Sequence, residues 1–241
     1  MRTHQSIFKF ALLTACALGV IFQAPDGNAQ STIFDKPSTD VESPGKVYLE
    51  LDFITHFASY ADGGYQSFGP RVVVGLPGKT EIGINGFYTR AKPGEPIQIE
   101  PNFKWQFYSD ETRGLAAAAG VLVSIPVTRR KEGTTTAMFY AVGSKTFEGR
   151  FGPRFTVGGY SLAGWLEDGT TKHGVLLGYE QPVTKRISFL ADWASGNNDY
   201  GYVVAGTGIT LSTKDSFYAG YNFGNHGRGN NSLGLYYGRS F

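Results

Sequence analysis

Short segments in which large apolar residues alternate with polar ones recur from Lys46 to the end of the chain. In the clearest instance one row is Ile97, Ile99, Phe103, Trp105 and Phe107, and the other is Gln98, Glu100, Asn102, Lys104 and Gln106. A period of two places the two rows on opposite faces of a β-strand, whereas a helix needs a period near 3.6. The sequence therefore predicts an all-β chain.

Turn signals divide this region into twelve such segments, with no domain boundary among them. The segments are Lys46–Phe57, Gln66–Leu76, Thr80–Arg90, Ile97–Tyr108, Leu115–Ile125, Thr134–Phe147, Phe155–Trp165, Lys172–Pro182, Ile187–Ser195, Tyr202–Leu211, Ser216–Gly224 and Ser232–Phe241. About ten residues suffice for a tilted strand to cross a bilayer. Tight charged turns alternate with loops that are on average longer. We therefore predict a single antiparallel up-and-down transmembrane β-barrel of about 12 strands over residues 46–241.

The last strand supports the membrane location. Its large residues are Leu233, Leu235, Tyr237 and Phe241, which share one face. The strand resembles the closing strand of a bacterial outer-membrane barrel, which typically ends in an aromatic residue. Closure then requires pairing with Lys46–Phe57. Arg239 lies on the same outward face, so we expect it near the periplasmic headgroups.

The N-terminus predicts export. Arg2 and Lys9 precede the apolar run Phe10–Phe22, and small residues follow at Gly27 and Ala29. This is the pattern of a cleaved signal peptide, and the run is too short for a membrane helix. We assign residues 1–29 to the signal and expect the mature chain in the cell outer membrane. The surroundings of Cys16 also fit a lipid-modified cysteine, so lipidation stays an open alternative.

Residues 30–45 form a polar stretch that contains Pro37 and Pro44 and shows no periodicity. We expect a flexible periplasmic leader, mobile or laid on the surface. An insert in the barrel lumen is the less favoured alternative.

Composition excludes several kinds of site. Cys16 is the single cysteine, so the mature chain would have no disulfide and no cysteine metal site. Without Arg2, Lys9 and Asp26 the chain keeps 20 basic and 19 acidic residues (22 − 2 and 20 − 1), a balance that argues against a nucleic-acid partner. Three scattered histidines give no zinc site. We expect no metal and no cofactor.

The polar rows would face the lumen of such a barrel. The lumen-lining candidates are Glu50, Asp52, Arg71, Glu100, Asn102, Lys104, Glu180, Asp192 and Asn222. They support two interpretations, a constriction that selects small solutes or a charge network that fills the interior. Hairpin symmetry places Asp52 near Arg71. Pro101 lies within a strand and predicts a bulge or a shorter strand, because proline lacks a ladder donor.

An enzyme is not expected. Outer-membrane phospholipase A, also a twelve-stranded barrel, carries a His-x-Ser pair on one strand. Here the histidines of the mature chain, His56, His173 and His226, are followed at the second position by Ala58, Val175 and Arg228. The serine nucleophile of that pair is therefore missing.

Several segments resemble the putative outer-membrane transporters of the meta-pathway of phenol degradation family. They are Glu81–Asn85, Pro101–Tyr108, Leu190–Trp193 with Ser195 and Gly196, and the C-terminal strand. The resemblance implies a porin-like barrel that moves small, often aromatic, molecules, with no catalytic residues to transfer. The expected partners are outer-membrane lipid, the barrel-assembly machinery and a small-molecule solute. Alternatives are a non-conducting structural or binding barrel and a soluble exported lipocalin-like barrel. Solute identity and oligomeric state are not given by the sequence.

Overall fold

The computed structural model describes residues 31–91, 94–130, 133–149, 151–226 and 231–241. The predicted signal peptide, residues 1–29, lies outside these ranges, and so does Cys16. The signal peptide and the alternative of lipidation at Cys16 therefore remain predictions. No helix of the described ranges is long and apolar enough to cross a membrane.

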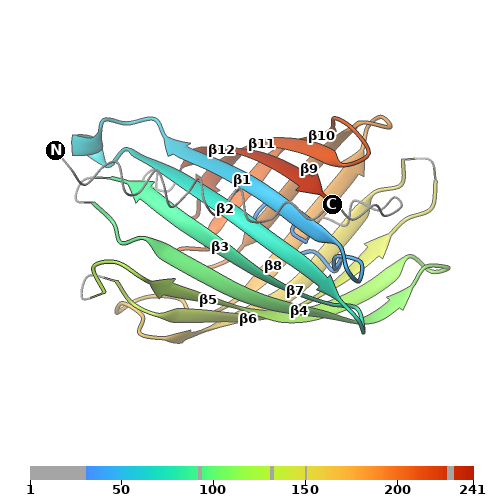
Figure 1. Cartoon of the computed structure of the whole chain (residues 1–241), viewed down its shortest axis with the longest axis horizontal. Helices are drawn as coiled ribbons and strands as arrows, with labels where there is room; N and C mark the ends of the chain where they lie inside the picture. Colours follow the sequence, from blue (N-terminus) through green and yellow to red (C-terminus); the bar gives the residue numbers. More distant parts are fainter. Residues whose placement is uncertain (1–30, 92–93, 131–132, 150, 227–230) are drawn as a thin grey trace.

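The described chain forms a closed barrel of twelve antiparallel strands, as predicted (Figure 1). The strands are β1 (Val47–His56), β2 (Tyr65–Leu76), β3 (Thr80–Arg90), β4 (Gln98–Asp110), β5 (Leu115–Pro126), β6 (Thr136–Thr146), β7 (Arg154–Gly164), β8 (His173–Pro182), β9 (Ile187–Ala194), β10 (Tyr202–Thr210), β11 (Asp215–Gly224) and β12 (Ser232–Ser240). Each strand pairs with its sequence neighbours, and β12 pairs with β1 to close the sheet. Closure leaves no strand edge with unpaired backbone groups. A sheet that spans lipid must have no such edge.

The alternation in the sequence corresponds to the two faces of this wall. On β1 the side chain of Leu51 is 63% exposed on the outer face, whereas that of Glu50 is 4% exposed on the inner face. Trp105 and Lys104 repeat the contrast on β4. The outer face carries many exposed aromatic rings, among them Phe57, Tyr88, Trp105, Phe107 and Trp165. Girdles of aromatic residues at both membrane interfaces are typical of transmembrane β-barrels.

The closing strand β12 lies where the sequence predicts. Asp52 of β1 pairs with Tyr236, and Glu50 pairs with Gly238. Arg239 is 47% exposed and its guanidinium lies 3.3 Å from a carboxylate oxygen of Asp215 at the start of β11. The outward arginine therefore has an anionic partner next to the tight turn between β10 and β11.

The register of the first hairpin differs from the prediction. Arg71 pairs with Glu50, whereas Asp52 pairs with Gly69. The loop is asymmetric because the 3-10 turn η1 (Tyr60–Asp62) is followed by Gly63 in the left-handed region, at φ 84°. The hairpin centre therefore moves towards the N-terminus by one residue, and Arg71 meets a different carboxylate.

Pro101 neither shortens its strand nor carries the bulge. Strand β4 runs through it for 13 residues. Its ladder with β5 is interrupted between the pairs Ile99–Ile125 and Asn102–Leu122, and the register shift falls between Trp105 and Tyr108. Proline thus costs one stretch of ladder on the β5 side, since it has no N–H to donate.

The leader is the main departure from the sequence prediction. Residues 31–42 lie inside the barrel, where Figure 1 shows their blue trace between the walls, and the exposed residues 43–45 lead from them towards β1. We call residues 31–45 the plug. Its side chains Ile33, Phe34, Lys36 and Glu42 are all buried. The favoured expectation of a flexible leader does not hold for these residues, and the less favoured alternative, an insert in the lumen, does. Their polar groups find partners on inward-facing wall residues that the leader's own sequence does not reveal.

Candidate functional site

The plug enters the lumen at the end of the barrel that carries the tight turns. The amide of Gly45 donates to the carbonyl of Gly75 on β2 at 3.0 Å. A Cβ at Gly75 would clash with the carbonyl oxygen of Ser43. Glycine at this position therefore allows the plug backbone to contact the wall directly.

Glu81 of β3 and Lys104 of β4 form a buried ion pair, 3.1 Å apart, that binds both ends of the plug. Glu81 accepts hydrogen bonds from the Ser31 hydroxyl and from the Glu42 amide, the latter at 2.8 Å. Lys104 donates to the carbonyl oxygens of Ser31 at 2.6 Å and Asp40 at 2.5 Å. These contacts join the start of the plug to its last third.

The carboxyl group of Glu42 lies in an unfavourable place for a charge. Burial, together with the neighbouring Glu81 carboxylate, raises the pKa of Glu42 to about 7. Lys104, Lys46 and Arg71 act in the opposite direction. The plug is thus held most firmly when Glu42 is protonated.

Arg154 of β7 holds the middle of the plug. Its guanidinium donates two hydrogen bonds to the Asp40 carboxylate, at 2.6 and 3.1 Å, and one to the Thr39 hydroxyl at 2.8 Å. The same guanidinium lies 3.3 Å from Glu180 of β8. The Thr39 hydroxyl also shares a hydrogen bond of 2.7 Å with the Ser144 hydroxyl of β6. Two-pronged pairs between arginine and carboxylate fix orientation as well as position.

Asp192 of β9 binds the first turn of the plug. One of its carboxylate oxygens accepts the amide N–H groups of Phe34, Asp35 and Lys36, at 2.8, 2.9 and 3.0 Å. The Lys36 ammonium lies 3.3 Å from the centre of the Tyr202 ring. Burial lowers the pKa of Lys36, while Asp192 and Asp35 act in the opposite direction.

Apolar contacts with the wall also hold this turn of the plug. Phe34 packs against Tyr218 and Tyr236, with ring centres 6.3 and 6.0 Å apart. Ile33 lies against the backbone of β8 at Gly178, where the lack of a side chain leaves room for it. A Cβ added at Gly178 would clash with the terminal carbon of Ile33.

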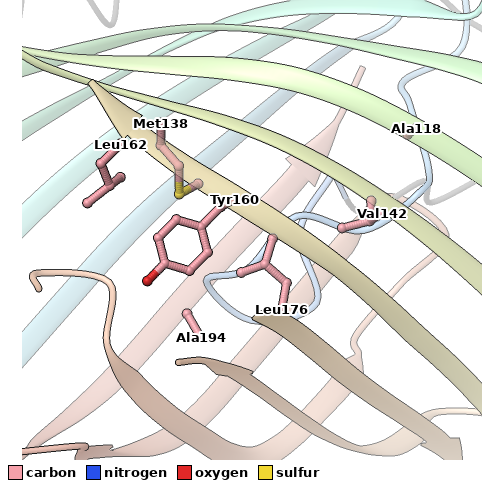
Figure 2. Packing of buried hydrophobic residues seen from close by; sticks show 7 residues of the cluster. All are labelled: Ala118, Met138, Val142, Tyr160, Leu162, Leu176 and Ala194. Atoms are coloured by element: carbon pink, nitrogen blue, oxygen red, sulfur yellow. The ribbon is translucent and has the colours of Figure 1, made fainter. Parts of the chain in front are cut away.

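A second apolar cluster lines the inner side of β5 to β9 (Figure 2). It consists of Ala118, Met138, Val142, Tyr160, Leu162, Leu176 and Ala194, with Tyr140, Leu166 and Tyr200 packed against it. The lumen therefore offers an apolar lining beside its charged residues.

The nine predicted lumen residues have different relations to the plug. Lys104, Asp192 and Arg71 contact it, the last through the Thr32 hydroxyl at 3.1 Å. Glu50 and Glu180 act through the arginines that they pair with, Arg71 and Arg154. Among the remaining four, Asn222 donates to Ser232 at 2.9 Å and Asn102 donates to the backbone carbonyl of Glu100 at 3.4 Å. Asp52 lies in register with Tyr236 and Gly69, and its Oδ1 has no hydrogen-bond partner among the described residues.

The nine candidates did not include Glu81, Arg154 or the plug. Glu81 and Arg154 belong to the polar rows that parity predicts to face the lumen. The plug residues had no such signal, since charges of both signs without periodicity also describe an ordinary leader. Within the described ranges no cluster of three histidine, cysteine or acidic side chains could hold a metal ion.

No protein-family model and no curated protein sequence matches the chain. Solved structures do match its fold. A KdgM porin superposes with a TM-score of 0.53 at 6% identity, over 80% of this chain and 98% of that one. An outer membrane channel from Pseudomonas putida F1 gives 0.55 at 10% identity, over 91% and 100%. Outer membrane phospholipase A from Escherichia coli gives 0.44 at 10%, over 83% and 94%, a likeness too weak to bear on activity. The chain thus has the fold of outer-membrane β-barrels. These comparisons do not show that it belongs to the meta-pathway of phenol degradation family.

Proposed function

We propose that this protein is a porin-like channel of the outer membrane for small solutes, and that the plug closes it. The observation that carries the proposal is a closed transmembrane barrel whose charged inner wall binds a segment of its own chain. The wall pairs Glu50–Arg71, Glu81–Lys104 and Glu180–Arg154 neutralise one another without the plug. Wall charges that are already paired can face water once the plug leaves.

The nature of the plug's contacts supports reversible closure. Its described backbone forms an isolated bridge between Thr32 and Pro37, and it adds no strand to the barrel, although the amide of Gly45 donates to Gly75 of β2. Apart from the apolar contacts of Ile33 and Phe34, hydrogen bonds and ion pairs hold it, and water can replace these groups as partners. It also buries Glu42 beside Glu81, two like charges when both are ionised. A permanent filling would be expected to avoid such a pair.

The proposed solutes are small and polar or amphiphilic, aromatic ones included. The inner wall offers charged pairs and the apolar cluster around Tyr160 and Leu176 (Figure 2). Amphiphilic molecules can use both kinds of surface. The similar solved structures are a porin and a channel, at identities that speak for the fold alone.

A substitution that removes the space in which Ile33 of the plug binds tests this function. Gly178→Leu fills the space that Ile33 occupies on β8. We expect purified, refolded protein in planar bilayers to show brief, rare openings for the wild type and at least a tenfold higher open probability for this variant. Gly143→Leu is the matched control, because a Cβ added at Gly143, on the outer face, would have no atom nearer than 3.8 Å.

The second candidate is a non-conducting barrel, favoured by the same occupied lumen. It predicts that neither variant conducts, although both migrate on a gel as folded barrels. Silence of correctly folded Gly178→Leu protein in repeated insertions would therefore reject the channel.

A further inference from the structure

Asp192 differs from the other paired carboxylates of the wall in the origin of its counter-charge. Glu50, Glu81 and Glu180 each face an arginine or lysine of a neighbouring strand. Among the described residues, the cation that acts electrostatically on Asp192 is Lys36, which belongs to the plug. When the plug leaves, the Asp192 carboxylate faces the open lumen without a cation from its own chain. A carboxylate without a partner attracts cations, so the open lumen favours a cation at this point.

The position of the Lys36 ammonium shows what kind of cation fits. It is buried, lies 3.3 Å from the centre of the Tyr202 ring, and has no hydrogen-bond partner among the described residues. Oxygen Oδ1 of Asp192 is equally buried and without a partner within the same ranges, since Oδ2 takes the three plug amides. An aromatic face together with a carboxylate is a favourable site for an organic ammonium ion.

The surroundings extend this site with an apolar surface. Leu190, Val204 and Tyr236 pack with Phe34 next to the first turn of the plug. The wall thus receives an ammonium group and an adjoining apolar body from its own chain. A free molecule with both features can occupy the same surface.

We infer that Asp192 and Tyr202 form a binding site for organic ammonium ions that carry an alkyl or aryl group, and that Lys36 fills this site while the plug is in place. The role of the site in transport rests on the proposed channel function. Binding itself does not, and it can be measured in the closed protein.

Removing the internal occupant tests the site. Lys36→Ala in the full chain takes away the ammonium and its stem but leaves Asp192 and Tyr202. At pH 7, about 50 mM n-butylammonium chloride should raise the melting temperature of this variant in detergent by about 3 °C or more, because a ligand that binds the folded state alone stabilises it. Phenethylammonium should act at lower concentration. The wild type, whose site is occupied, should shift by less than about 1 °C under the same conditions.

Two comparisons identify the groups involved. 1-Butanol, which has no charge, should leave Lys36→Ala unchanged. Adding Asp192→Asn, or Tyr202→Leu if that double variant does not migrate as a folded barrel, should weaken butylammonium binding at least tenfold. Equal shifts for wild type and Lys36→Ala, equal shifts with butanol, or full shifts in both double variants would overturn the inference. Failure of the channel would appear separately, as silence in planar bilayers.

Discussion

Single buried charges explain both how the plug is held and how it can be released. Lys104 and Arg154 each contact a wall carboxylate and the plug, so they keep a partner in either state. Glu42 behaves differently, because its carboxyl group is buried against Glu81. Ionisation of Glu42 therefore opposes docking.

Glu42 gives a prediction with a definite sign. Its pKa is about 7 when docked and 4.5 in water, so the docked state prefers the protonated form. Docking is therefore weakened as pH rises from about 4.5 to 7 and stays weakened above 7. A difference of that size corresponds to roughly 3 kcal/mol at most. We expect open probability in planar bilayers to rise at least tenfold between pH 5.5 and 8.

Glu42→Gln is the control for this pH dependence. Its amide keeps the shape of a protonated carboxyl group, so the variant should stay closed at pH 8. Lys36 acts in the opposite sense, because burial lowers its pKa, and the comparison between variants at each pH separates the two. If Glu42→Gln and wild type open equally at pH 8, Glu42 does not control docking.

At the scale of elements, strand β4 carries a weak point at Pro101. Its ladder with β5 is interrupted beside this residue. Pro101→Val restores an N–H and suits the outer face, so we expect the barrel to gain about 1 kcal/mol of stability. Urea unfolding in lipid vesicles measures it as a higher midpoint. Ile99→Val, on the same face of the same strand, adds no donor and should not raise the midpoint.

The strands were predictable from the sequence and the plug was not. Alternation between Leu51 and Glu50, or Trp105 and Lys104, is a local signal that each strand carries in its own residues. The first hairpin register depended on a 3-10 turn that hairpin symmetry cannot supply.

The plug's binding partners explain why the sequence did not reveal it. Asp40 binds Arg154, and the amides of Phe34 to Lys36 bind Asp192, more than 100 residues along the chain. A local pattern in a polar stretch cannot predict binding partners that become neighbours only when the barrel closes. Parity placed the polar rows on the inner face of the strands, whereas an insert in the lumen was the less favoured alternative for residues 30–45.

The whole molecule is a closed sheet with an apolar outer face, and this predicts its behaviour on a gel. Protein kept below its unfolding temperature in detergent should migrate faster than boiled protein, because the closed barrel stays compact. A membrane fraction should contain it. Recovery with soluble periplasmic proteins and no shift on boiling would contradict the membrane barrel and favour the soluble lipocalin-like alternative.

The central claim is that residues 31–45 close a conducting barrel. A disulfide that fixes the plug to the wall, and that a reductant can break, tests this claim most directly. The hydroxyls of Thr39 in the plug and Ser144 on β6 lie 2.7 Å apart. Thr39→Cys with Ser144→Cys places two thiols there, and Cys16, the chain's single cysteine, lies in the predicted signal peptide. The single-cysteine variants serve as controls. In planar bilayers at pH 8 we predict silence for the oxidised double variant and openings after a reductant is added, with no such change in the controls. Equal conductance of the oxidised and reduced double variant, with the disulfide confirmed by mass, would contradict this claim.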